Sequence, residues 1–252
     1  MWFSEGLTRS VARDLLHRFG LITPAELAAE VEGLVALAVT SPFRADDHAT
    51  LARRAAARER GALPLLVARG ALYALRIDAL IRARSGGKRS LDDVLRALYA
   101  RAAAQRGPLP TEAWTETIGA VLGAEAAARE QAAIERGAAV TQPADALGPC
   151  FALQEKGYAA FERGFDLEAT RAASPRTLVA LAPDGPAARA GARPGDLLEV
   201  WRETAGRSDV TAELVVTRDG TPRTFRYEPA GARGRGPGFR RKAEVPEARC
   251  AR

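Results

Sequence analysis

The start of the chain places one carboxylate where it could bind a metal. Glu5 follows Trp2, Phe3 and Ser4 and opens a long segment with helical apolar spacing. Two interpretations are open for this carboxylate. Ser4 and Glu5 can cap the helix and interact with its positive first turn, a contribution of about 0.3–1 kcal/mol. Alternatively, Glu5 is a metal ligand at the head of a rigid helix. Spacing alone favours capping.

The other residues with catalytic potential do not combine with Glu5. His17 lies on the same predicted helix, roughly 18 Å along the axis and about 120° around it from Glu5, so the two cannot share an ion. His48, which follows two aspartates, is interpreted as a solvated residue at a helix start. Capping and the helix dipole explain Asp92 and Asp93. No local pattern supports a Ser-His-Asp arrangement.

Residues 2–8, Trp-Phe-Ser-Glu-Gly-Leu-Thr, resemble the W-F-S-E-G-F-T motif of the glycyl aminopeptidase family of gluzincin zinc metallopeptidases. The resemblance continues through residues 85–95 and ends in PDZ-like stretches at 185–191 and 194–196, covering most of residues 1 to about 230. It implies a zinc cofactor, with Glu5 as the third zinc ligand. In that family a preceding His-Glu-x-x-His helix supplies the other two ligands, and this sequence does not contain that motif.

Two further elements of the family's catalytic site are replaced. The resemblance places an aspartate four residues after the ligand glutamate, where this chain has Arg9, and a cation there would weaken metal binding. It also places a tyrosine in a Y-x-K-G motif, where this chain has Val67; Tyr73 lies about 9 Å further along the helix. We therefore predict a degenerate, non-catalytic member without zinc. The alternative is the C-terminal half of an active zinc aminopeptidase.

Bulk properties exclude several classes of protein. The chain of 252 residues has 47% hydrophobic and 27% charged residues, and no apolar run is long enough to span a bilayer. Most of its net charge of +6 lies in residues 231–252, which hold seven basic and two acidic residues, so nucleic acid is not an expected partner. Cys150 and Cys250 are predicted to be free thiols. No signal segment opens this sequence, and its compartment is not predicted.

The hydrophobic period predicts an α+β chain with four parts. These are an all-α metallopeptidase-like region (1–136), a linker (137–149), a PDZ-like small β-barrel (150–230) and a disordered basic tail (231–252). The predicted helices are 5–19, 24–40, 46–60, 64–83, 90–104, 111–122 and 124–136. Strands are predicted at 165–167, 178–181, 197–201 and 210–216, with a type I′ hairpin turn at 219–220 and a return strand at 224–227.

Residues 162–165, Glu-Arg-Gly-Phe, resemble the carboxylate-binding loop of PDZ domains, which bind peptide termini by strand addition. Arg163, Gly164 and Phe165 are the predicted peptide-binding residues, with Arg163 as the charge partner. Only residues 203–209 are available for the helix that forms the opposite wall of such a groove, so the groove is half-built. The predicted partners are a peptide or protein C-terminus, or an N-terminal part of the enzyme that this chain lacks.

Overall fold

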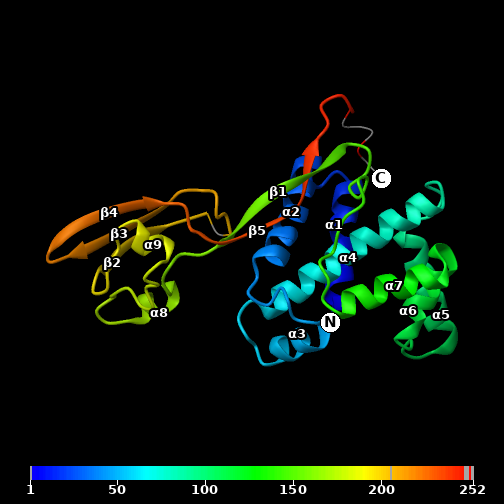
Figure 1. The fold of residues 1–252 in the computed structure, drawn as a ribbon, viewed down its shortest axis with the longest axis horizontal. Helices are drawn as coiled ribbons and strands as arrows, with labels where there is room; N and C mark the ends of the chain where they lie inside the picture. Colours follow the sequence, from blue (N-terminus) through cyan, green and yellow to red (C-terminus); the bar gives the residue numbers. More distant parts are fainter. Residues whose placement is uncertain (1, 205, 247–249, 251–252) are drawn as a thin grey trace. The chain divides into compact units, whose positions relative to one another are not determined.

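The computed structural model describes residues 2–204, 206–246 and 250, and the chain divides into two compact units (Figure 1). The first comprises Met1–Lys156 and Arg235–Arg252, and the second comprises Gly157–Gly234. Strands β1 (Phe151–Phe161) and β5 (Ala230–Arg241) pair with each other and carry the chain from one unit to the other and back. The predicted linker at 137–149 therefore lies inside the first unit.

Helix α4 forms the centre of the first unit because it is buried along most of its 23 residues. Small and apolar side chains lie on every side of it, which is the pattern of a fully enclosed helix. The predicted all-helical region is confirmed: it consists of η1 (Trp2–Leu7), α1 (Thr8–Arg18), α2 (Pro24–Thr40), α3 (His48–Ala56), α4 (Ala62–Arg84), α5 (Leu91–Gln105), α6 (Glu112–Leu122) and α7 (Ala124–Glu135).

Capping signals predicted from the sequence mark the starts of α2 and α5 but not the start of the first helix. Thr23 and Glu26 form the predicted capping box of α2, and Asp93 accepts from the backbone N–H of Ser90 at 2.8 Å at the start of α5. The predicted N-cap at Ser4 is wrong. Helical structure already begins at Trp2 as the π-helix η1, so Ser4 lies inside the helix.

Two predictions for the end of the chain are wrong. Cys150 and Cys250 form a disulfide across a separation of 100 residues, so they are not free thiols. Residues 231–241 are not disordered, because β5 pairs with β1. Beyond β5, the backbone N–H of Lys242 donates to the carbonyl of Cys150 at 2.8 Å. Of the predicted tail, residues 247–249 and 251–252 lie outside the described part of the chain.

In the second unit, strands β2 (Leu197–Arg202), β3 (Ala212–Arg218) and β4 (Thr221–Tyr227) form an antiparallel sheet in that order. Asp219 and Gly220 have φ values of 49° and 73°, as the predicted type I′ turn requires. The short helices α8 (Leu167–Ala172) and α9 (Pro186–Arg189) precede the sheet.

The strand predicted at residues 165–167 is wrong because Asp166 starts α8, where its carboxylate accepts from the backbone N–H of Ala169 at 3.0 Å. The strand predicted at 178–181 is also wrong, since this stretch contributes only isolated bridging positions. The described strands form one two-stranded and one three-stranded sheet and no closed barrel. The α+β class is confirmed.

No helix in the described residues is long and apolar enough to cross a membrane.

Candidate functional site

Glu5 lies on an exposed part of η1, at a place fixed by a close crossing of two helices. A Cβ atom on Gly6 would lie 2.5 Å from the Cα of Gly70 in α4, which is closer than real Cβ contacts allow. The backbones of η1 and α4 therefore touch, and the contact leaves no room for a side chain on Gly6. The crossing leaves the Glu5 side chain in solvent.

The residues around Glu5 do not fit a zinc site. Zinc needs three protein ligands and an open position for water. Among the described residues, no group of three His, Cys, Asp or Glu side chains is arranged to hold a metal. Arg9 follows Glu5 by one turn of helix and is also exposed. Within the described residues, Glu5 is therefore a single exposed carboxylate followed one turn later by a cation.

The two histidines have other roles. His17 is buried, with Nδ1 3.4 Å from the carbonyl of Ile22 and Nε2 3.2 Å from the carbonyl of Cys250. Both ring nitrogens thus face backbone oxygens. His48 is the first residue of α3 but is partly buried rather than solvated as predicted, and burial lowers the pKa of its imidazole.

Residues 67–70, which stand where the family has its Y-x-K-G motif, perform a structural task in α4. The buried Arg69 donates to the carbonyls of Asp46 and Arg44, each at 2.7 Å, and fixes the turn before α3. Burial lowers the pKa of the Arg69 guanidinium. Together with Gly70 at the crossing, these contacts give the Arg-Gly pair a structural role in α4.

Tyr73 does not replace the family's tyrosine hydroxyl. It is 2% exposed, and its hydroxyl accepts from the Trp114 indole N–H at 3.2 Å. Burial raises its pKa to about 12. Tyr73 packs in the core with Trp114 and the other apolar residues of α4, α5 and α6, so its ring has a packing role.

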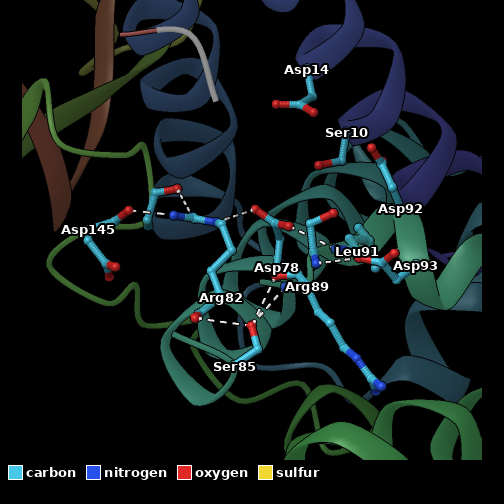
Figure 2. Close-up of polar contacts among 12 residues, drawn as sticks. Ser10, Asp14, Asp78, Arg82, Ser85, Arg89, Leu91, Asp92, Asp93 and Asp145 are labelled. Atoms are coloured by element: carbon cyan, nitrogen blue, oxygen red, sulfur yellow. Dashed lines mark hydrogen bonds and ion pairs between the residues drawn. The ribbon is translucent and has the colours of Figure 1, made fainter. Parts of the chain in front are cut away.

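The stretch that resembles the family at residues 85–95 joins α4 to α5 through polar contacts (Figure 2). Asp78 accepts from Arg82 at 2.9 Å and from the backbone N–H of Leu91 at 2.9 Å. Arg82 also donates to the carbonyl of Ala146 at 3.1 Å. Asp92 pairs with Arg18 of α1 at 2.7 Å. The contacts of residues 85–95 therefore help to hold the helices together.

Arg163, the predicted charge partner of a peptide, already has a partner in the second unit. Its guanidinium forms two hydrogen bonds with the Glu203 carboxylate, the Nε bond being 2.8 Å long. The hydrogen bond to Glu203 raises the pKa of Arg163. The Tyr227 hydroxyl donates to the Arg163 carbonyl at 2.9 Å, and burial raises the pKa of that phenol. Both the side chain and the backbone carbonyl of Arg163 are thus held in place by hydrogen bonds.

The backbone of the same loop offers unused donors. Among the described residues, nothing accepts from the N–H groups of Gly164 and Phe165. Gly164 has a φ of 88°, and a Cβ atom there would lie 2.8 Å from the backbone nitrogen of Ala187 in α9. The Phe165 ring is buried, 5.2 Å edge-on from Trp201. Both residues are buried, and adjacent free N–H groups are the kind of donors from which anion-binding nests are built.

The predicted site residues are divided between the two units. Glu5 lies in the first unit, and Arg163, Gly164 and Phe165 lie together in the second. Sequence reasoning missed Glu203 and Tyr227 as the residues that hold the loop. Both are far from Arg163 in sequence, and no local spacing signals either pairing.

Comparisons with known proteins give a likeness of fold but no match of sequence. No protein-family model matches the sequence, and no curated protein gives a significant match. The crystal structure of an aminopeptidase N family protein from Idiomarina loihiensis is similar, with a TM-score of 0.60, 19% identity and coverage of 99% of this chain. This chain spans 48% of the length of that one. At this identity the similarity establishes the fold: the chain is folded like about half of an aminopeptidase N family protein.

Proposed function

We propose that this chain is a degenerate member of the glycyl aminopeptidase-like metallopeptidases that does not hydrolyse peptides by itself. The observation that carries the proposal is the surface around Glu5. There a single exposed carboxylate is followed by Arg9, and the motif glycines Gly6 and Gly70 serve helix packing. The fold likeness supports the ancestry. The motif residues that this chain retains favour a structural role over a catalytic one.

The test is hydrolysis of aminoacyl p-nitroanilides by the purified chain with added zinc. We expect no turnover above buffer. Glu5→Gln is the control variant, because any trace of contaminating peptidase will survive that substitution unchanged. Zinc-dependent turnover that is lost in Glu5→Gln would overturn the proposal.

A second function, peptide binding by the PDZ-like unit, is favoured by the free N–H groups of Gly164 and Phe165. A terminal carboxylate is the ligand such a nest accepts. Because Glu203 already neutralises Arg163, the backbone rather than that guanidinium would hold the carboxylate. Arg163 then positions the loop.

A library of peptides with free and amidated C-termini tests this binding. We expect binding only to free carboxylates, and at least a tenfold loss in Gly164→Ala, where the new Cβ meets Ala187. Gly195→Ala is the matched control: Gly195 also has positive φ, at 90°, but nothing lies near its Cβ position. Arg163→Ala is a second loop variant if Gly164→Ala misfolds. Equal binding of amidated peptides would contradict this function.

A third candidate is the C-terminal half of an active zinc aminopeptidase. It is favoured by the 48% coverage of the Idiomarina loihiensis chain. Co-expression with a polypeptide that carries a His-Glu-x-x-His helix tests it. Zinc-dependent activity of the pair that is lost in Glu5→Gln would establish this function in place of the first.

A further inference from the structure

The helical unit contains a hollow that none of the roles above uses. It lies between α4, α6 and α7, is largely open to solvent, and has a volume of about 430 Å³. Helices α6 and α7 pack against each other and against α4 in this part of the unit (Figure 1). Pockets that bind small ligands span about 300–1,000 Å³.

The floor of the hollow is apolar. Leu80 and Ala83 come from α4, Leu122 comes from the end of α6, and Ala126 comes from α7. Leu80 and Leu122 are only partly buried, at the edge of the main core. Their exposed surface would gain about 25 cal/mol for each Å² covered by an apolar ligand.

The charged groups at the rim favour an anionic head group. Arg84 is exposed and has no partner among the described residues. Arg129 pairs only with Glu125, and these side chains are 65% and 90% exposed, so the pair is weak. The one acidic residue of the rim, Glu130, is already occupied by Arg76, which donates to both carboxylate oxygens at 2.7 Å. The lining therefore presents a net positive charge, two exposed arginines against one carboxylate that Arg76 already pairs.

We propose that this hollow binds a monocarboxylate with an unbranched apolar tail, the chemistry of a free fatty acid. The tail covers Leu80, Ala83, Leu122 and Ala126, and the carboxylate faces Arg84. Arg129 adds to the positive field. The site is independent of the function proposed above, since it uses neither Glu5 nor the loop at residues 163–165.

The test uses sodium decanoate, below its micellar concentration, titrated into the ¹⁵N-labelled full chain. Decyltrimethylammonium, which has the same tail and the opposite charge, is the head-group control. We expect saturable decanoate binding with amide shifts concentrated at Leu80, Ala83, Leu122 and Ala126. We expect decyltrimethylammonium to bind at least fivefold more weakly.

Variants separate this site from general surface binding. Arg84→Gln should weaken decanoate binding at least fivefold, and Ala83→Trp, at an exposed position, should fill the hollow and abolish it. Arg96→Gln and Ala97→Trp make the same changes on the exposed face of α5 and should leave binding unchanged. The proposal is overturned if decanoate does not bind saturably, if both detergents bind equally, or if Ala83→Trp binds like the parent chain.

Discussion

At the scale of the residue, the contact between Gly6 and Gly70 explains part of the opening motif. Gly6→Ala places a Cβ 2.5 Å from the Gly70 backbone, and overpacking of this kind costs about 1–3 kcal/mol. We expect Gly6→Ala to lower the free energy of unfolding by that amount in urea denaturation. Gly33→Ala in α2, where nothing lies within 4 Å of the Cβ position, should raise it by roughly 0.5–1 kcal/mol. Equal effects of the two substitutions on the free energy of unfolding would contradict the close contact between Gly6 and Gly70.

A second residue-scale prediction concerns the ion pair of Asp196 in the second unit. Asp196 is 1% exposed and accepts from Arg218 at 2.6 and 2.8 Å and from the backbone of Arg193 at 2.9 Å. Asp196→Ala leaves the Arg218 charge without its partner and should cost about 3–5 kcal/mol. Glu168→Ala, which removes an exposed pair with Arg171, should cost less than about 1 kcal/mol in the same assay.

The Asp196 pair also sets a pH dependence. Burial raises the pKa of the Asp196 carboxyl, but the hydrogen bonds from Arg218 and Arg193 outweigh burial, and the pKa lies below its ordinary value. A carboxyl with a lowered folded pKa contributes stability above its unfolded pKa, about 3.9, and loses it as the pH falls further. The stability difference between the parent chain and Asp196→Ala should therefore shrink below about pH 4. A difference that grows there would contradict this assignment.

At the scale of the element, the disulfide ties the start of β1 to the end of the chain. Closing a loop of 100 residues restricts the unfolded chain by about 4.7 kcal/mol in the chain-entropy model, and losses of about 2–5 kcal/mol are typical. We expect the Cys150→Ala/Cys250→Ala variant to unfold at lower urea concentration. Its midpoint should not respond to reductant, whereas that of the parent chain should fall. An unresponsive parent chain would show that the thiols are free.

At the scale of the element, some structures could be predicted from the sequence and others could not. The capping box at Thr23 and Glu26 and the turn at Asp219 and Gly220 were predictable, because all of their interactions lie within a few residues. The strand β5 was not, since a glycine- and arginine-rich segment becomes a strand only by pairing with the distant β1. The disulfide and the Arg163–Glu203 pair are non-local in the same way.

At the scale of the whole molecule, the chain has the fold of about half of an aminopeptidase N family protein, and several residues of the resembling motifs have structural contacts. Gly6, Arg69 and Gly70 hold helices and turns together, and Tyr73 lies in the core. From the sequence, the candidate site could be assessed only through Arg9 and Val67, which stand where the resemblance places an aspartate and a tyrosine. Their surroundings required the structure.

The central claim is that Glu5 has no metal-binding site around it, and zinc stoichiometry tests this most directly. The purified full chain is dialysed against micromolar zinc and then analysed for zinc per chain, beside Glu5→Gln. The account predicts the same background level in both, well below one zinc per chain. One zinc per chain in the parent and none in Glu5→Gln would contradict it.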